Sequence, residues 1–277
     1  MRKSTRLFSA VLALCLLLSL TPMPQAAEDE TAVLPEDTGE LSTLASGDVA
    51  YSGYCGKGGD GSSISWELDL EAETLTFSGT GAMKDYSSVG SAPWFKALDP
   101  YNDSDSSIRL TVTVGEGITH ISSYFSGAFS DICGEIKLPS TLTSIGSHAF
   151  EWLSGGLPSS LTIPAKITDL GDYTFANCSG LEEVTFEGPE IWTGKYLLSG
   201  CKNLKAIHLS DGLTSIPEGF ASSCSILSRL DLPDSVKTVG AKAFKDCTSL
   251  SDVKFSAALK TISSNAFSNC SALAGTL

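Results

Sequence analysis

The last third of the chain repeats one pattern at a fixed interval. In each unit an L-x-x-[VIL]-x-[LF] stretch is followed by A-F-x-x-C or a close variant of it. The opening leucines and the cysteines both return every 23 residues, at Leu181, Leu204, Leu227, Leu250 and Leu273 and at Cys178, Cys201, Cys224, Cys247 and Cys270. Such self-similarity is typical of a solenoid, in which each unit buries its apolar side only against its neighbours.

The repeats extend over residues 108–277. We expect about seven units of roughly 20–25 residues, forming a curved, mainly β solenoid with short helical turns. In one unit, 236–240 reads as a second extended segment and 241–247 as a tight helical turn. Gly127 and Gly155-Gly156 mark insertions, and the stretch 187–200 departs from the pattern. An eighth unit begins at Leu273, which predicts either a longer protein or end-to-end self-association through an uncapped C-terminal unit.

The first 27 residues have the anatomy of a secretory signal peptide. Basic residues at Arg2, Lys3 and Arg6 precede an apolar run from Leu7 to Leu20 and a small-residue site at Ala26-Ala27. The run is shorter than the ~18–20 apolar residues of a spanning helix, so no membrane span is predicted. Lipid attachment at Cys15 is disfavoured, because Cys15 lies inside the apolar run. The sequence predicts a secreted or extracellular protein, with cell-surface association left open.

Charge excludes some classes of partner. The formal net charge is −14, and no cluster of Lys or Arg is present to neutralise phosphates. Nucleic acid and anionic lipid are therefore not expected as partners. Residues 28–50 contain seven acidic residues and no Lys or Arg, which predicts a disordered acidic linker.

Residues 51–107 are expected to form an N-terminal β-hairpin cap and a long loop. Apolar residues alternate with polar ones over 64–70 and again over 75–77, with a polar turn at 71–74. A hairpin there could cover the first repeat, whose strand edge would otherwise be open. The loop, 84–107, carries aromatic residues that are candidate contacts or packed edges: Tyr86, Trp94, Phe95 and Tyr101, with Trp152 and Trp192 later in the chain.

Several motifs together resemble the BspA-like leucine-rich repeats of bacterial surface proteins. They include S-I-G-S-H-A-F at 144–150, T-V-G-A-K-A-F-K-D-C at 238–247, and L-P segments at 138–140 and 232–235. W-E-L-D, T-L-T-F-S-G-T-G-A-M-K-D-Y and the Pro93-Trp94 pair resemble the segment that precedes such repeats. The resemblance covers roughly residues 51–277. It implies an extracellular binding or adhesion role without catalysis, and it does not name a ligand.

The outward positions of the strands are the candidate binding surface. In L-x-x-V-x-F the residue between the last two apolar positions faces solvent, and these residues should form a row: Lys137, Thr162, Thr185, His208, Asp231 and Lys254. A second row contains Glu183, Ala206, Arg229 and Asp252. Such a grid is typical of solenoid binding surfaces for a protein or glycan. For each position, the alternative is an ordinary solvated strand residue. For the protein, the alternatives are a targeting module of a secreted enzyme or a structural envelope component.

The cysteine ladder allows a chemical and a structural interpretation. A thiol could act as a nucleophile with His208, or each cysteine could be a buried apolar residue stacked on its equivalent. A nucleophile is needed once, so five equal intervals favour the structural interpretation and free thiols. A bridge between Cys55 and Cys133, which lie outside the ladder, stays open.

Other catalytic and metal motifs have no support in the sequence. The G-x-G-x-x-G at 56–61 shows no following helix, and the three histidines form no H-E-x-x-H. No C-x-x-C or G-x-S-x-G occurs, and Glu182 and Glu183 point to opposite faces of a strand. No enzyme activity, metal or cofactor is predicted.

Overall fold

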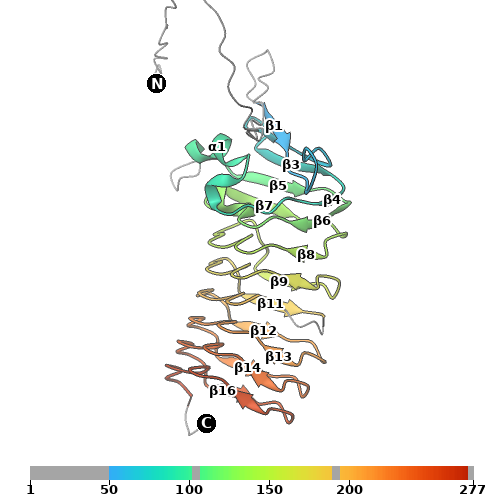
Figure 1. Cartoon of the computed structure of the whole chain (residues 1–277). Coiled ribbons are helices and arrows are strands. Elements are labelled where there is room, and N and C mark those ends of the chain that lie inside the picture. The colour runs from blue at the N-terminus through green and yellow to red at the C-terminus, as the bar shows by residue number, and fades with distance from the viewer. Residues whose placement is uncertain (1–49, 102–106, 189–193, 274–277) are drawn as a thin grey trace, which may run out of the picture. The chain divides into compact units, whose positions relative to one another are not determined.

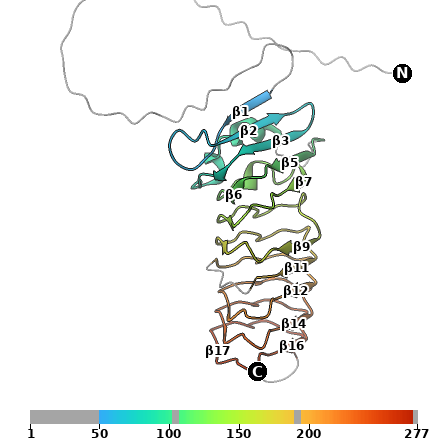
Figure 2. The same cartoon turned by 90° about the vertical axis from the view of Figure 1, so that its right-hand side faces the viewer.

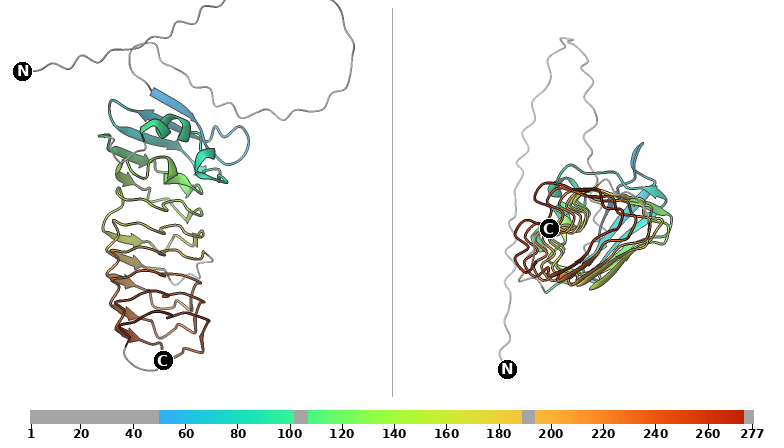
Figure 3. Two further views of the ribbon diagram at one scale, coloured as in Figure 1. Left: turned by 90° about the vertical axis from the view of Figure 1, so that its left-hand side faces the viewer. Right: turned by 90° about the horizontal axis from the view of Figure 1, so that it is seen from below.

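The structure, a computed structural model, describes residues 50–101, 107–188 and 194–273. In those ranges it contains seventeen strands, one α-helix and three 3-10 helices. Figure 1 shows the strands stacked one above another, and the view along the stack in Figure 3 shows successive units superposed. The predicted mainly β solenoid is confirmed.

One series of parallel strands forms the first side of the stack. Its members are β5 (Leu110–Val114), β7 (Cys133–Lys137), β9 (Ser160–Ile163), β11 (Glu183–Phe186), β12 (Ala206–His208), β14 (Arg229–Asp231) and β16 (Asp252–Lys254). Burial alternates along these strands as their sequence predicts. In β11, Val184 and Phe186 are buried, whereas Glu183 and Thr185 are half-buried. We call the outward side of this series the strand face.

A second series of very short strands lies on another side of each unit. Its members are β4 (Gly81–Ala82), β6 (Ile118–Ile121), β8 (Ser144–Ile145), β10 (Asp169–Leu170), β13 (Ser215–Ile216), β15 (Thr238–Val239) and β17 (Thr261–Ile262). All their pairings are parallel. The extended segment predicted at 236–240 is β15. The irregular stretch predicted at 187–200 lies partly outside the described residues.

The turns that end each unit form a third hydrogen-bonded side. The amides of Tyr173, Phe175 and Asn177 donate to the carbonyls of Lys195, Leu197 and Ser199 in the next unit, at 2.8, 3.0 and 2.7 Å. The same three bonds recur between all later pairs of turns. Of the predicted helical turns, η3 (Phe125–Ala128) is a 3-10 helix, and the later ones are hydrogen-bonded turns with two left-handed positions each. Asn177, Gly200 and Asp246 each occupy the second left-handed position of their turn, and residues of these types tolerate positive φ.

The residues at the first left-handed position of successive turns form an aromatic column. Tyr124, His148, Tyr173 and Tyr196 stack in succession, with ring centroids 4.7, 5.0 and 4.9 Å apart and nearly parallel planes. The column ends at Gly219, where a Cβ atom would lie 2.1 Å from the Tyr196 ring. This column was not predicted from the sequence, although its members recur at intervals of 23 to 25 residues.

The N-terminal part continues the first strand series as a hairpin (Figure 2). β1 (Ala50–Tyr54), β2 (Ile64–Asp69) and β3 (Thr74–Gly79) pair antiparallel, and β3 pairs in parallel with β5. The predicted hairpin is therefore present. β1 was not expected, because the sequence around Gly53 lacks apolar alternation. Gly53 instead packs against the Trp66 ring, and a Cβ atom added to Gly53 would lie 2.7 Å from Trp66 Nε1. We propose that the hairpin caps the first repeat.

The prediction of a long loop at 84–107 is wrong for the described part of that segment. It contains η1 (Val89–Ser91), α1 (Phe95–Leu98) and η2 (Asp99–Tyr101). Trp94 is fully buried, with its ring centroid 4.9 Å from that of Phe77 and 5.7 Å from that of Phe125. Its Nε1 donates to the Phe125 carbonyl at 3.2 Å. A buried Trp stabilises best when its N–H has such a partner, so the aromatic residues fold this segment against the hairpin and the first repeat.

Replacing Trp94 by alanine should destabilise the protein strongly. The change removes a fully buried ring and its hydrogen bond, so we expect a loss of about 3–5 kcal/mol in the free energy of unfolding. Trp152→Ala is the matched control, since Trp152 is 65% exposed and its loss should cost within about 0.5 kcal/mol. Urea denaturation followed by circular dichroism checks both. Equal midpoints for the two variants would contradict the packing described here.

Candidate binding surface

Parallel pairing aligns the candidate residues of the strand face in rows. Thr185 lies opposite Thr162 on one side and opposite His208 on the other. Further along the stack, Arg229 lies opposite Asp252 and Asp231 opposite Lys254. Lys137 belongs to β7, where it pairs with Thr113. The side chains are exposed or half-buried, and strand pairing aligns them from β9 to β12 and again from β14 to β16, while their role in binding stays a prediction.

The charged residues of the strand face pair with one another. His208 Nε2 lies 2.7 Å from Glu183 Oε1. Arg229 lies between two carboxylates, at 3.1 Å from Asp231 Oδ1 and 3.2 Å from Asp252 Oδ2. Pairs this exposed contribute little to the stability of the fold, because water screens them and ordering the side chains costs entropy. A partner can therefore replace them at little cost to the fold.

The strand face is interrupted between β12 and β14. In the fully described stretch 206–231 these two strands share no hydrogen-bonded ladder, although they are neighbours in the first series. The interruption leaves a recess of about 270 Å³ lined by Lys205, Ala206, Ile207, His208, Leu209, Arg229 and Asp231. Three of the predicted site residues, His208, Arg229 and Asp231, thus line one recess together with the apolar residues Ala206, Ile207 and Leu209.

The aromatic candidates lie elsewhere. Trp94 belongs to the core and cannot contact a partner in the folded protein. Tyr86, Phe95 and Tyr101 are half-buried and pack against the same core. Trp152 is exposed, and Trp192 lies outside the described residues. The structure therefore supports the packed-edge alternative for Trp94.

The cysteine ladder is structural. Each ladder thiol is buried and donates to a backbone carbonyl of the preceding unit, at 3.0–3.2 Å. Burial raises the pKa of all five thiols, to about 12 at Cys201 and Cys247. A thiol so disfavoured as a thiolate is a poor nucleophile. All seven described cysteines are free, and Cys55 and Cys133 form no bridge in the part of the chain that the structure describes.

One Ser, one His and one Asp also meet in the structure. His120 Nδ1 lies 2.8 Å from Ser144 Oγ, and its Nε2 lies 3.1 Å from Asp85 Oδ1. Acyl transfer would need amide donors for an oxyanion beside the serine. The amides of Thr143 and Gly146, on either side of Ser144, donate to ladder carbonyls instead. This cluster thus ties the segment around Asp85 to the second strand series.

Metal-binding groups and membrane-spanning helices are two further features that bear on the site. No group of three or more His, Cys, Asp or Glu side chains that could hold a metal ion is found in 50–101, 107–188 and 194–273. Within the same ranges, no helix has the length and apolar character required to cross a membrane.

The fold and this surface define the protein as a leucine-rich-repeat solenoid with an outward parallel-strand face. The BspA type leucine rich repeat model matches residues 105–192 and 154–274 with six copies, together more than half of the chain. The chain therefore belongs to this family, as its motifs suggested. Six copies is one fewer than the expected seven units, although the first strand position recurs seven times in the described residues. No curated protein matches the chain.

Solved structures of three bacterial proteins are similar. A leucine-rich repeat protein from Bacteroides ovatus is 24% identical with a TM-score of 0.50, covering 59% of this chain and 47% of that one. One from Eubacterium ventriosum is 20% identical with a TM-score of 0.37, covering 82% and 91%. A leucine rich cell surface protein from Faecalibacterium prausnitzii is 19% identical with a TM-score of 0.43, covering 64% and 62%. The chain thus spans less than half of the Bacteroides ovatus protein, and identities this low show the fold alone.

The ladder thiols should resist modification in the folded protein. Their raised pKa values leave almost no thiolate at pH 8, and burial blocks the reagent. We expect slow reaction with 5,5′-dithiobis(2-nitrobenzoate) at pH 8 and fast reaction in urea. A control variant, Ser228→Cys, adds an exposed thiol that should react at once. Fast labelling of Cys201 or Cys247 in the native protein, located by peptide mapping, would contradict a structural ladder.

Proposed function

We propose that the protein is a secreted or cell-surface binding protein that recognises an extracellular protein or glycan through its strand face. One observation carries the proposal: the recess between β12 and β14, where His208, Arg229 and Asp231 lie beside the apolar residues Ala206, Ile207 and Leu209. A recess with charged walls offers both an apolar contact and directional hydrogen bonds, which together give specificity.

The outward residues are free to serve a partner because the fold does not depend on them. The buried residues of each unit and the backbone ladders hold the stack together, whereas the exposed charges form weak pairs. Many such contacts spread over several units would suit adhesion, in which individual contacts are weak and their number gives strength.

Location outside the cell is part of the same proposal. It is supported by the signal-peptide pattern over residues 1–27 and by the family of the chain. One solved structure with the fold belongs to a protein described as a leucine rich cell surface protein. A targeting module of a secreted enzyme and a structural envelope component are the alternatives, and neither has an observation of its own in the described residues.

End-to-end self-association belongs to the proposal as a second mode of contact. Ile262 is 44% exposed in the last described unit, whereas Ile216 and Val239 at the same position in earlier units are fully buried. The two apolar residues Val253 and Phe255 of the same unit are also less buried than their equivalents Leu230 and Leu232. Apolar surface of this kind is stabilised when a second copy of the chain, or a further repeat, covers it.

A binding screen of the purified protein against extracellular-matrix proteins and a glycan array tests the strand face. The triple variant His208→Ala/Arg229→Ala/Asp231→Ala should weaken any binding found at least tenfold, because it removes the polar wall of the recess. All three side chains are exposed, so the variant should keep the circular dichroism spectrum and the unfolding midpoint.

The double variant Lys195→Ala/Glu218→Ala is the matched control. It removes one ion pair of 3.0 Å on the turn side and leaves the strand face unchanged. Equal loss in both variants would mean that the effect is general, and unchanged binding in the triple variant would place the partner elsewhere.

A further inference from the structure

A second interruption of the first strand series has a visible cause in the sequence. Gly156 forms an isolated parallel bridge with Glu135, and the Ile136 amide donates to the Gly156 carbonyl at 2.9 Å. The inserted residues thus occupy the edge of β7 that the next strand would use. β9 begins at Ser160 and pairs with β11; within the fully described stretch 133–163 it shares no ladder with β7.

The position of Gly156 accepts only glycine. Its φ is +80°, and a Cβ atom there would lie 2.4 Å from Cys133 Sγ. The close approach lets the insertion pack tightly at the start of β7, while the far ends of β7 and β9 stay apart. The separation is local, because β6, β8 and β10 remain paired in the second series.

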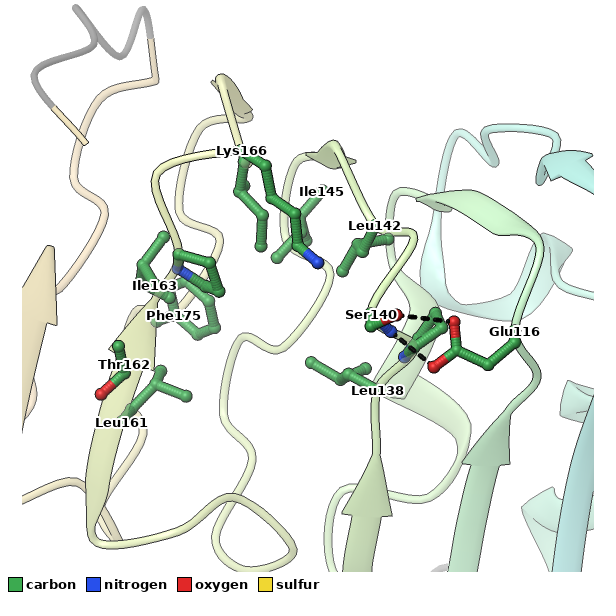
Figure 4. Close-up of a pocket in the computed structure, with 13 residues that line it drawn as sticks. Glu116, Leu138, Ser140, Leu142, Ile145, Leu161, Thr162, Ile163, Lys166 and Phe175 are labelled. Carbon is green, nitrogen blue, oxygen red and sulfur yellow. Dashed lines mark hydrogen bonds between the residues drawn. The ribbon is translucent and has the colours of Figure 1, made fainter. Parts of the chain in front are cut away.

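A cavity of about 360 Å³ fills the space between the far ends of β7 and β9 (Figure 4). Most of its lining is apolar and includes Leu138, Leu142, Ile145, Leu161, Ile163 and Phe175, while Ser140 and Thr162 add two hydroxyl groups. All of these apolar residues except Leu138 are buried, at 7% exposure or less. Ligand sites in proteins are typically apolar cavities of about 300–1,000 Å³ with few polar groups.

Two charged side chains line the rim, and only one is available. Glu116 accepts hydrogen bonds from the Ser140 amide at 2.8 Å and from Ser140 Oγ at 3.0 Å, so both of its oxygens are engaged. Lys166 is exposed and forms no ion pair within 4 Å with any described residue, although its charge adds at longer range to the Ser140 hydrogen bonds in lowering the pKa of the Glu116 carboxyl. Figure 4 shows its side chain lying over the cavity, directed toward the wall that carries Leu142 and Ser140.

We propose that this cavity binds a medium-chain aliphatic carboxylate, with the chain against the aliphatic walls and the carboxylate on Lys166. At roughly 30 Å³ for each water-sized group, the cavity accommodates about a dozen non-hydrogen atoms. Decanoate has that size. The Lys166 ammonium can donate to a bound carboxylate and repels a cationic head group, while the Glu116 carboxylate on the same rim is held by Ser140.

The site is independent of the recess between β12 and β14. The two sites share no lining residue, so failure of one proposal leaves the other standing. The sequence offered one signal for the cavity, the Gly155-Gly156 insertion, but no spacing rule tells how far an insertion separates two strands.

Isothermal titration calorimetry with decanoate, decanol and decyltrimethylammonium tests the site on the full protein. Decanoate should bind the unaltered protein at least tenfold more tightly than decanol, and decyltrimethylammonium should not bind. Lys166→Met keeps a chain of similar length without charge, so it should lower decanoate affinity about tenfold and leave decanol unchanged. Leu138→Trp fills the mouth of the cavity and should abolish binding of both decanoate and decanol.

Lys237→Met is the control for charge, because Lys237 is exposed and lies outside the cavity. It should bind decanoate like the unaltered protein. The proposal is overturned if the unaltered protein does not bind decanoate, if Lys166→Met binds it equally well, or if Leu138→Trp binds it undiminished while keeping its unfolding midpoint. Equal binding of the cationic amphiphile would overturn the role of Lys166.

Discussion

The structure depends on backbone hydrogen bonds between consecutive units. A single unit has too few apolar residues and too many unpaired backbone groups to be stable alone. Stacking resolves both problems at once, because β-strand pairing on two sides and turn pairing on the third bury the leucines, phenylalanines and cysteines between them. The thiols take part as well, since each donates to a carbonyl of the unit before it. A fixed interval in the sequence is thus the direct consequence of a fixed register in space.

Regular stacking also explains where a binding surface can arise. A perfectly paired strand series presents a flat grid whose side chains are exposed and weakly paired. The two recesses described above lie where neighbouring strands lose their ladder, between β7 and β9 and between β12 and β14. Both interruptions spare the core, because the turn side stays paired through the same units.

Much of this arrangement follows from the sequence. The repeat interval predicts the stack, the alternation in L-x-x-V-x-F predicts which side chains face outward, and the hairpin at 64–77 is visible as two alternating runs. Three features did not follow. Trp94 and Phe95 looked like loop residues, since nothing local shows that Trp94 packs on Phe77 and Phe125 across the hairpin. The intervals of the column from Tyr124 to Tyr196 vary, so a fixed repeat does not reveal it. The Gly155-Gly156 insertion marks where β7 and β9 separate but not how far, and no residue pattern marks the separation of β12 from β14.

Backbone amide hydrogen exchange, followed by mass spectrometry or NMR, tests most directly whether pairing between units holds the protein together. Turn amides often face water, but the amides of Tyr173, Phe175 and Asn177 donate to carbonyls of the next unit. We expect these amides to exchange as slowly as the amides of β11 in the same region, because both are released only when the two units open together. Fast exchange at these turns beside a protected β11 would mean that the turns fluctuate independently, and that pairing on the turn side contributes little to the stack.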